Sequence, residues 1–441
     1  MTIEIPEAVL KIINRINSAG YEAYIVGGCV RDYLLGRVPC DWDITTDAKP
    51  AEIKKLFTRT IDTGIEHGTV TVMEGSIGYE VTTYRIDGEY EDSRHPKNVT
   101  FTASLEEDLK RRDFTINAMA YHPEKGIVDI FGGREDLANH IIRAVGDARS
   151  RFGEDALRMM RAVRFAAQLG YTIEDETFHA IRELAPTLAN ISAERIQTEM
   201  VKTLVSDNPY SFKLYYETGL SAVFLPEFDV AMKTEQNHIH HMYSVGEHIL
   251  HSIENIKAEK VLRLAMLFHD MAKPRMLTID EEGVTHFHGH PDESAVMAGE
   301  IMRRLKFDNA SIDAVKVYCR YHDRHIEPTQ KAMRRALNSI GDKYFPDLFA
   351  VNRADVLAQS MYMREEKLAA IDELERVYEE VISKKQAFSL KDLAVCGRDL
   401  MEEGVSPGPG IGEILGRMLE DVIEEPSHND REYLLNKYVR N

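Results

Sequence analysis

The spacing of apolar residues changes near residue 147, and this change constrains the fold more than any other feature of the chain. Before it, short runs of β-branched and aromatic residues alternate with helical stretches, with glycine turns between them. After it, apolar residues recur three and four positions apart almost to the end of the chain, which predicts helices. The sequence therefore predicts an α+β domain followed by all-α domains.

We expect short elements in the first domain and longer ones afterwards. Strands are predicted at 24–26, 42–46, 69–74 and 79–85, and helices at 30–35 and 50–57. Later helices are predicted at 156–169, 196–205, 261–268 and 368–381. With the motifs described below, the predicted domains are an α+β head (1–147), a helical neck and body (148–235), a histidine-rich helical domain (236–360) and a helical tail (361–441).

The composition is that of a chain with several ordinary cores and no membrane segment. The chain has 441 residues, of which 44% are hydrophobic and 29% charged, and no apolar run approaches the length of a membrane span. Its first residues have neither the basic nor the apolar part of a secretion signal. The cysteines are scattered without a close pair: Cys29, Cys40, Cys319 and Cys396. Together these features predict a cytoplasmic protein without a disulfide framework.

The net charge of −19 argues against indiscriminate binding of nucleic acid, because phosphate binding usually leaves a basic surface. It does not exclude a single shaped RNA partner. Arg158, Arg161 and Arg164 recur about one helical turn apart. We therefore expect a local basic groove on an acidic molecule, and an RNA affinity that falls as the salt concentration rises.

Gly27 and Gly28 lie directly between a predicted strand and a predicted helix. Glycines in such a position let backbone N–H groups approach a phosphate, and the helix N-terminus favours an anion there. Alone, this pair indicates no more than a tight turn.

Asp41 and Asp43 are two positions apart in a predicted strand, so their side chains are expected on one face. Two neighbouring carboxylates repel each other unless a cation lies between them. A pair of Mg²⁺ ions about 4 Å apart fits such carboxylates, and would activate a hydroxyl while holding a triphosphate. Glu80, on a later predicted strand, supplies a third carboxylate. We interpret Asp41, Asp43 and Glu80 as a catalytic group.

Two further segments carry charges that suit a nucleotide. Arg111 and Arg112 can clamp triphosphate oxygens, and Asp113 can accept hydrogen bonds from ribose hydroxyls. Asp155 and Arg158 are three apart in a predicted helix and are expected on one face. A carboxylate accepts from the exocyclic amino group of C or A, and a guanidinium donates to the adjacent ring acceptor. U and G mismatch both contacts, so this pair can admit C and A alone.

The motifs follow one another in a characteristic order: Gly27-Gly28-x-Val30-Arg31-Asp32, Asp41-x-Asp43, Arg111-Arg112-Asp113-Phe114-Thr115-Ile116-Asn117-Ala118 and Glu154-Asp155-x-x-Arg158. This order resembles the bacterial class II tRNA nucleotidyltransferases, the CCA-adding enzymes, which are related to bacterial poly(A) polymerases. The resemblance is close over about residues 20–220 and looser in the tail. It implies a polymerase-β-like head, a neck that selects the base, and a body and tail that hold tRNA.

The resemblance also implies residue roles. Asp41 and Asp43 would bind Mg²⁺, and Glu154, Asp155 and Arg158 would form an amino-acid template for CTP and ATP. The full set of expected nucleotide-binding residues is Gly28, Arg31, Arg111, Arg112, Asp113, Asn117, Glu154, Asp155, Arg158, Arg161 and Arg164. Residues 84–96 look like the complete form of a segment that favours full CCA addition over CC addition. Addition of A alone and poly(A) synthesis stay open.

A second group of polar residues lies among apolar helices. His248 lies in a helical stretch, His269 and Asp270 end an apolar helix, and Asp355 falls on an apolar helix face. A carboxylate in such surroundings needs a partner, and a metal ion is one. Imidazole and carboxylate ligands suit Mn, Fe, Ni, Co or Zn, and the sequence does not choose among them.

These four residues resemble the H…HD…D pattern of the HD phosphohydrolase superfamily. The resemblance implies a metal hydroxide that attacks a phosphoester, with phosphatase or 2′,3′-cyclic phosphodiesterase activity and a role in RNA repair. His290 and His322 fall where some members supply ligands for a second metal. His241 is the alternative first ligand, and an HD fold kept only as a structural module is the alternative to a working site.

The tail segment 400–415 contains a loop of Pro and Gly residues and looks like the C-terminal segment of the same family. Its turn could present N–H groups to tRNA phosphates or simply join two helices. The sequence thus predicts a cytoplasmic, Mg²⁺-dependent CCA tRNA nucleotidyltransferase with an HD domain. We expect tRNA, CTP and ATP as partners and no association with a membrane. The oligomeric state stays open. The alternatives are a poly(A) polymerase and an HD hydrolase whose head only binds RNA.

Overall fold

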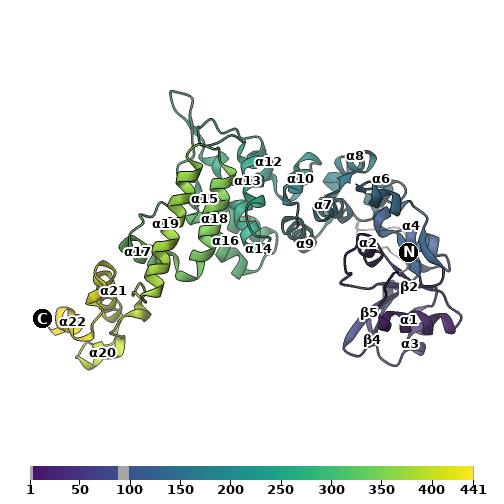
Figure 1. Cartoon of the computed structure of the whole chain (residues 1–441), viewed down its shortest axis with the longest axis horizontal. Coiled ribbons are helices and arrows are strands. Elements are labelled where there is room, and N and C mark those ends of the chain that lie inside the picture. The colour runs from purple at the N-terminus through teal and green to yellow at the C-terminus, as the bar shows by residue number, and fades with distance from the viewer. Residues whose placement is uncertain (1–2, 88–98, 441) are drawn as a thin grey trace. The chain divides into compact units, whose positions relative to one another are not determined.

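The structure is a computed structural model that describes residues 3–87 and 99–440. It contains two compact units, Met1–Pro226 and Glu227–Asn441 (Figure 1). The division lies close to the predicted boundary at 235, whereas the predicted boundaries at 147 and 360 lie inside the units and stay predictions. No helix among the described residues combines the length and the apolar character that a membrane span requires.

The first unit is built on a mixed sheet of seven strands in the order β3-β4-β5-β2-β1-β8-β9. Its strands are β1 (Ala23–Val26), β2 (Ile44–Thr46), β3 (Thr60–Gly64), β4 (Thr69–Glu74), β5 (Ile77–Thr83), β8 (Met119–His122) and β9 (Gly126–Asp129). β2 and β5 run parallel, with Ile44 opposite Val81, and the other neighbours are antiparallel. β6 (Arg85–Asp87) and β7 (Val99–Phe101) pair separately.

The predicted strands were wrong at some ends. β2 begins at Ile44, so Asp41 and Asp43 precede the strand. The ladder ends there because its partner β1 stops at Gly27, whose φ of 83° turns the chain away. One contact persists beyond the strand, since the Val26 N–H donates to the Asp43 carbonyl at 3.0 Å. β5 begins before the predicted residue 79, because only two residues form the turn after β4.

Helices cover the sheet, and the apolar spacing predicts which faces they bury. α1 (Glu7–Ser18) buries Val9, Ile12, Ile13 and Ile16, which lie three or four residues apart. It contacts β1 and lies beside α3 (Pro50–Leu56), as Figure 1 shows. The remaining helices of the head are α2 (Gly28–Leu34), α4 (Leu105–Lys110) and α5 (Gly133–Ala138), with a 3₁₀ turn η2 at Thr115–Asn117.

The rest of the first unit is helical, with one exception. Its helices are α6 (Ala148–Glu154), α7 (Leu157–Leu169), α8 (Asp175–Leu184), α9 (Ala193–Leu204), α10 (Lys213–Glu217) and α11 (Ser221–Phe224). α7 packs against α9 and is largely buried. The prediction of an all-α neck was wrong in one detail, because β10 (Ile141–Ile142) pairs in parallel with β11 (Thr172–Ile173). Strands of two residues carry too little pattern to be recognised from sequence.

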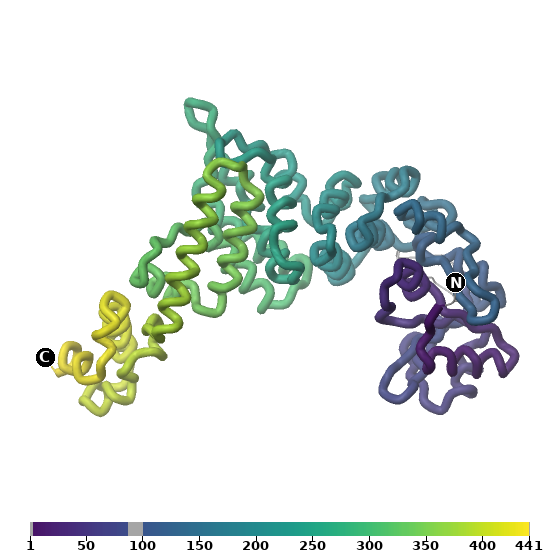
Figure 2. Tube along the Cα trace, in the orientation of Figure 1, coloured from purple at the N-terminus to yellow at the C-terminus, as the bar shows by residue number. Residues whose placement is uncertain are grey.

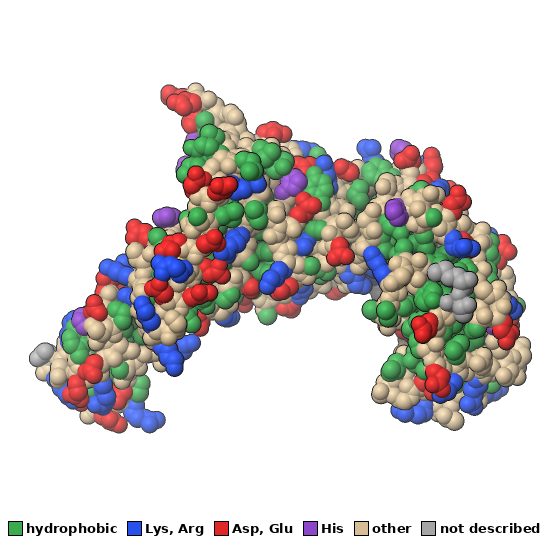
Figure 3. Space-filling model, viewed as in Figure 1, with side chains coloured by type: hydrophobic (Ala, Val, Ile, Leu, Met, Phe, Trp, Pro, Cys, Tyr) green, Lys and Arg blue, Asp and Glu red, His purple; other side chains and the backbone are tan. Residues whose placement is uncertain are grey.

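The second unit surrounds one buried helix, α14 (Lys260–Phe268), which contacts its neighbours α13, α15, α16 and α18. The helices are α12 (Pro226–Met232), α13 (Val245–Glu254), α15 (His290–Arg304), α16 (Asn309–Tyr321), α17 (Gln330–Ile340), α18 (Phe345–Ala358) and α19 (Arg364–Ser383). A hairpin of β12 (Thr278–Ile279) and β13 (Thr285–His286) departs from the predicted all-α domain. Figure 3 shows acidic side chains at its projecting tip, where Asp280, Glu281 and Glu282 lie.

The tail has a small core of its own. α19 leads from the packed helices to α20 (Gly397–Glu402), α21 (Pro409–Glu424) and α22 (Arg431–Leu435), as the trace in Figure 2 shows. The core residues are Ala387, Val395, Leu400, Met418, Val422, Leu434 and Leu435. The predicted Pro/Gly loop is confirmed as the connection between α20 and α21, with Gly404 at a φ of 93°. Arg334 of α17 donates to the Ile423 carbonyl at 2.7 Å and ties the tail to the helices.

Candidate active sites

Three carboxylates lie near the start of β2, where it meets β5 in the middle of the head sheet. The parallel register of β2 and β5 brings Glu80 opposite Asp43, and Asp41 lies two residues before it. Partial burial raises the pKa of Glu80, and the charges of Asp43 and Asp41 raise it further. Burial also raises the pKa of Asp43, where Arg112 opposes the shift and Asp41 adds to it. The three carboxylates therefore repel one another as like charges.

Such a group of acids is suited to a hard cation. Mutual repulsion is relieved when a divalent ion lies between the carboxylates, and ligands that are all oxygen favour Mg²⁺. Neighbouring protein atoms partly desolvate the Asp43 carboxyl, but Asp41 and Asp43 both keep solvent-accessible surface, so they are open to a substrate. Among the described residues, these carboxylates do not form as tight a cluster as the groups in the second unit. A bound triphosphate would have to complete their coordination of a metal.

The glycine turn between β1 and α2 allows an arginine to approach the backbone. A Cβ on Gly27 would lie only 3.0 Å from the Arg112 guanidinium, and its φ of 83° also disfavours other residues. Nearby, Arg31 donates to the Asn117 amide oxygen at 2.6 Å. Gly28, the first residue of α2, lies in this turn as the sequence predicts. The nucleotide-binding roles of Gly28, Arg31 and Asn117 stay predictions.

A cleft of about 260 Å³ brings together the arginine-rich motif and the start of α7. It is lined by Arg111, Arg112, Asp113, Asp155, Leu157, Arg158, Arg161 and Arg195. Guanidinium groups are the preferred protein ligands for triphosphate oxygens. The buried Asp108, which the sequence analysis did not single out, holds Arg111 at 2.7 Å and lies 3.5 Å from Arg112. Asp108 lies three residues before Arg111, and residues with this spacing are neighbours on a helix, so the sequence could have indicated their contact.

Asp113 lies at the floor of this cleft. Burial alone would raise the pKa of its carboxyl, but Arg161 at 2.5 Å and the Asn117 amide outweigh burial and hold that pKa well below its usual range. The carboxylate is therefore charged at neutral pH and fixes the Arg161 guanidinium. The predicted contact of Asp113 with ribose stays a prediction.

The prediction that Asp155 and Arg158 lie on one helix face was wrong. Asp155 follows the last residue of α6 instead of lying within a helix, and its partner is Arg195 of α9 at 2.8 Å. Arg158 binds Glu154 at 2.5 Å and donates to the Arg111 carbonyl at 3.0 Å. The break between α6 and α7 turns the two side chains to different neighbours. Both still line the cleft, so a role in base selection stays a prediction.

Arg164 is not among the residues that line the cleft. It is buried, lies 3.2 Å from Glu199 and stacks over the Phe165 ring at 4.2 Å. Arg161 also lies over the Phe165 ring, at 5.4 Å, so the two guanidinium groups share this neighbour. Their carboxylate partners differ, because Arg161 pairs with Asp113 and Arg164 lies beside Glu199. The structure shows Arg164 packed against Phe165 and Glu199, and its predicted contact with a nucleotide stays a prediction.

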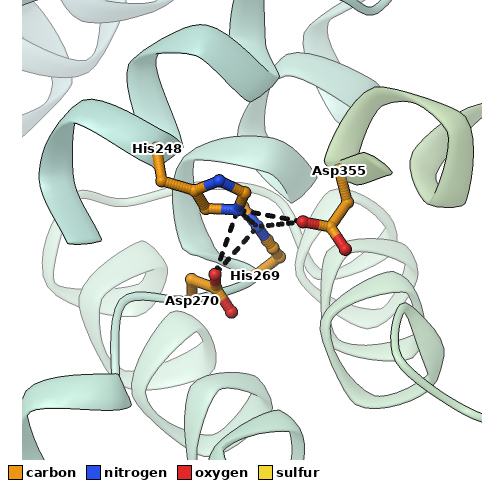
Figure 4. Close-up of side chains that lie close together, drawn as sticks. All are labelled: His248, His269, Asp270 and Asp355. Atoms are coloured by element: carbon orange, nitrogen blue, oxygen red, sulfur yellow. Dashed lines mark hydrogen bonds and ion pairs between the residues drawn. The ribbon is translucent and has the colours of Figure 1, made fainter. Parts of the chain in front are cut away.

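In the second unit, four buried side chains converge from three helical segments (Figure 4). His248 comes from α13, Asp355 from α18, and His269 and Asp270 follow α14 directly. His248 Nε2 lies 2.9 Å from Asp355 Oδ1 and 3.2 Å from both Asp270 Oδ2 and His269 Nε2. The sequence prediction that these four residues meet is thus confirmed as geometry.

Asp270 also belongs to a second group. Its Oδ1 lies 3.1 Å from His290 Nε2 and 3.5 Å from His322 Nε2. His290 begins α15 and His322 follows α16, so the two additional predicted ligands converge on the same carboxylate. One carboxylate shared by two imidazole groups is the arrangement that bridges two metal ions.

The four imidazoles of the two groups are oriented alike. In each ring Nδ1 lies within hydrogen-bonding distance of a backbone carbonyl: Ala358 for His248 (3.3 Å), Met266 for His269 (2.7 Å), Phe287 for His290 (2.8 Å) and Cys319 for His322 (2.7 Å). A donating Nδ1 leaves the lone pair of Nε2 directed into the cluster, as metal ligands require. The backbone therefore fixes the direction of all four rings.

The charges of the cluster call for a cation. Burial lowers the pKa of His269, but Asp270 and Asp355 outweigh burial and raise it to about 10, so without a metal ion a proton on Nε2 takes the place that the metal would have. The imidazoles and Lys273 in turn hold the pKa of Asp270 well below its usual value against the effect of burial. Both Asp270 oxygens are buried, yet neither makes a hydrogen bond of good geometry within the described residues. Buried, charged oxygens of this kind fit a metal ion.

His241, the alternative first ligand, does not belong to either group. Its ring meets the His248 ring edge-on at 5.7 Å, and its Nδ1 is buried without a hydrogen-bond partner among the described residues. Burial and the charge of Lys273 lower its pKa to about 3, so this imidazole is neutral. The structure thus supports His248 over His241 in the cluster.

A pocket of about 400 Å³ opens onto both groups. Its wall contains Lys273, whose ammonium group lies 2.7 Å from Asp270 Oδ2 and 3.2 Å from Gln236 Oε1. Further histidines line the mouth: His238, His240, His286 and His288. A cationic wall beside two potential metal positions suits a phosphate group.

Comparison with known proteins bears on both units. Residues 23–143 match the Poly A polymerase head domain, and residues 170–232 match the "Probable RNA and SrmB- binding site of polymerase A". Residues 277–438 match a tRNA nucleotidyltransferase domain 2. These matches cover the sheet with its carboxylates, residues 170–232 and most of the second unit. They leave out residues 144–169, which contain α6, α7 and the predicted base-selecting residues.

Whole-length relatives decide the family. The CCA-adding enzymes of Lactiplantibacillus plantarum and Latilactobacillus sakei are 37% and 38% identical to this chain, over 97% of it and 95% and 96% of their own lengths. The chain belongs to the family of CCA-adding enzymes. The Bacillus stearothermophilus CCA-adding enzyme, solved in complex with CTP, shares 32% identity and a TM-score of 0.71 over 97% of this chain and 96% of its own. The polymerase head sheet with a mostly helical body is thus the fold of a CCA-adding enzyme.

Membership of the CCA-adding enzymes makes the chain a nucleotidyltransferase, and a divalent metal such as Mg²⁺ fits the carboxylates of its head. The Thermotoga maritima CCA-adding enzyme complexed with tRNA is similar in fold alone, at 21% identity and a TM-score of 0.62 over 98% of this chain and 95% of its own. The three matched domain ranges leave out residues 233–276, which contain His248, His269 and Asp270. The function of the second cluster therefore has to be argued from its own geometry.

Proposed function

We propose that this protein adds CCA to the 3′ end of tRNA, with CTP and ATP as substrates. The observation that carries the proposal is the whole-length similarity to CCA-adding enzymes, together with the three neighbouring carboxylates where β2 meets β5 in the head sheet. The relative solved with CTP indicates the class of nucleotide that such a head binds. The alternative, a bacterial poly(A) polymerase, would catalyse the same nucleotidyl transfer and differ only in its product.

In this proposal the chain's residues divide the work of an in-line transfer. Asp41, Asp43 and Glu80 would hold Mg²⁺, which when bound lowers the pKa of the attacking RNA hydroxyl and neutralises the triphosphate. Arg111 and Arg112 bind triphosphate oxygens, because Asp108 holds both guanidinium groups toward the cleft. The ribose hydroxyl attacks the α-phosphate and pyrophosphate leaves, so no covalent enzyme intermediate is needed.

Base selection is proposed for the residues that follow α6. The Asp155 carboxylate accepts from the amino group of C or A, and Arg195 keeps it charged and oriented at 2.8 Å. Arg158, held by Glu154, donates to the ring acceptor beside that amino group. U and G offer a carbonyl and a ring N–H at these places, which leaves the partly buried Asp155 and Arg158 without a matching partner. Residues 88–96 of the segment expected to favour full CCA addition lie outside the described residues.

The decisive experiment uses a tRNA that lacks its CCA end. Purified protein, CTP, ATP and Mg²⁺ are expected to extend it by three nucleotides and then stop. A long A tail would identify a poly(A) polymerase instead. No extension, combined with tight tRNA binding, would support a head that only binds RNA.

We further propose that the second unit is a metal-dependent phosphohydrolase. The observation in favour is the pair of imidazole–carboxylate groups that share Asp270, with every ring oriented by a backbone carbonyl. Mn, Fe, Ni, Co and Zn all fit these ligands. When bound, such ions supply a hydroxide for attack on a phosphoester, and Lys273 is placed to bind a phosphate oxygen. Phosphatase or 2′,3′-cyclic phosphodiesterase activity toward RNA ends is the proposed reaction, with a role in RNA repair.

The test of this second function is hydrolysis after loading with each metal in turn. Glycerol 2-phosphate and a 2′,3′-cyclic nucleotide serve as substrates, and bound metal is counted by elemental analysis. We expect about two ions per chain and hydrolysis of at least one substrate. Tight metal binding without hydrolysis of either would favour a structural module.

A further inference from the structure

The pocket of the second unit has an aromatic wall that neither imidazole–carboxylate group uses. We define the ring strip as the four histidines of this wall, His238, His240, His286 and His288, together with Tyr362, which lies next to His240 outside the wall. His238 stacks on His240 with 5.0 Å between ring centroids, and His286 stacks on His288 at 5.6 Å with an angle of 6° between the rings. Tyr362 lies 5.1 Å from His240, and His238 lies 6.4 Å from His286. The strip thus continues from the surface into the pocket.

The strip is held in place by backbone contacts between three segments. Ser360 N–H donates to the His240 carbonyl at 2.9 Å, and its hydroxyl donates to the Ile239 carbonyl at 2.8 Å. Thr285 N–H donates to the Asn237 carbonyl at 3.1 Å. These bonds join the loop before α13 to the start of α19 and to the hairpin. The strip is therefore organised before any ligand binds.

The arrangement of the strip is unlike that of a metal site. Within the described residues, its imidazole nitrogens do not gather into a group of three potential ligand atoms. Two of them have other partners, since His286 Nε2 binds Asp280 at 2.8 Å and His240 Nδ1 lies 3.1 Å from Lys367 Nζ. The rings instead offer flat faces, and Tyr362 is 45% exposed. Stacked, accessible rings are suited to a flat aromatic ligand.

We propose that the ring strip binds the base of a nucleotide whose phosphate lies at Asp270, and so determines the substrate specificity of the second unit. The inference rests on the proposed phosphohydrolase function. The four histidines of the strip line one pocket of about 400 Å³ together with Asp270 and Asp355, and Tyr362 adjoins this pocket through its contact with His240. The volume lies within the usual range for small-molecule sites. Stacking discriminates weakly among bases, since every base has a π-face. The site therefore prefers the terminal nucleotide of an RNA over a phosphate that has no base.

Two phosphomonoesters, one with a base and one without, distinguish base binding by the strip from a general role in hydrolysis. The metal-loaded full-length protein is assayed with adenosine 2′-phosphate and with glycerol 2-phosphate, and the ratio of their kcat/KM values measures the preference. We expect Tyr362→Ala and His238→Ala each to lower this ratio about tenfold, through a higher KM for the nucleotide. Tyr362→Phe keeps the ring and is expected to restore the ratio. Met401→Ala, which removes a similarly exposed side chain in the tail, is the matched control.

Two results would overturn the proposal, and a third would separate it from the proposed phosphohydrolase function. An unchanged ratio in Tyr362→Ala and His238→Ala overturns the proposal. Equal losses on both substrates with a lower metal content also overturn it, because the strip would then serve the metal. If the wild type hydrolyses neither substrate, the phosphohydrolase proposal fails, and equilibrium binding of adenosine 2′-phosphate decides on the strip. Tighter binding to the wild type than to Tyr362→Ala supports a base site, and equal binding contradicts it.

Discussion

The two candidate active sites differ in how many of the ligands for a metal ion the protein itself supplies and orients. In the head, Asp41 and Asp43 keep access to solvent, and partial burial together with repulsion from these two carboxylates raises the pKa of Glu80. In the second unit, the carboxylate of Asp270 is buried among imidazoles that backbone carbonyls orient. The first arrangement suits a metal that arrives with a triphosphate, because Mg²⁺ usually keeps few protein ligands. The second suits a resident metal, because its ligands are already directed inward.

The largest expected effect follows from removing a head carboxylate. Asp41→Ala should lower nucleotide incorporation at least about a thousandfold, a loss of about 4 kcal/mol in transition-state stabilisation. Phosphoester hydrolysis should continue in the same preparation. Primer-extension and hydrolysis assays on one sample check both. Loss of the two activities together would contradict two separate sites.

The converse change concerns the second unit. His269→Ala should lower hydrolysis at least about a hundredfold and reduce bound metal, while CCA addition continues. Because His269 is buried, Asp355→Asn provides a variant of nearly the same shape in case the first does not fold. Elemental analysis and both assays are the measurements. Unchanged hydrolysis in a folded variant would exclude this cluster as the hydrolytic site.

A smaller effect is expected for the arginine that the sequence analysis did not identify. Arg195→Ala removes the partner of Asp155, so discrimination of CTP over UTP should fall about tenfold. Arg149→Ala, which breaks an exposed ion pair with Glu183, is the matched control. Competition between CTP and UTP for the first added position measures the effect. Equal discrimination in Arg195→Ala and Arg149→Ala would show that Asp155 needs no partner.

The smallest effect is on stability. The pKa of Asp43 is raised in the fold, so its charged form is unfavourable and its ionisation destabilises the folded state as the pH rises through that pKa. Asp43→Asn should therefore stabilise the metal-free protein at pH 7 by less than about 1 kcal/mol, since the carboxylate is exposed and screened. The gain should vanish as the pH falls and the wild-type carboxyl becomes protonated. Thermal unfolding at several pH values tests the sign, and a destabilised variant at pH 7 would contradict it.

The two sites also differ in how much of them the sequence could predict. His248, His269 and Asp355 each interrupt an apolar helical pattern, so their own surroundings indicated a shared polar centre. The partner of Asp155 is Arg195, 40 residues away on another helix, and no local pattern reports such a contact. Arg164 had the right spacing, but spacing does not reveal that Glu199 and Phe165 surround it. Element types were predicted better than ends, because the end of β2 depends on where its partner β1 turns away.

One measurement tests the central claim directly. Purified protein is incubated with CTP, ATP, Mg²⁺ and a tRNA that lacks its last three nucleotides, and the 3′ ends of the products are sequenced. The account predicts a product that ends in CCA and grows no further. A tract of A, a product that stops at CC, or no extension by a folded protein that binds the tRNA would contradict it.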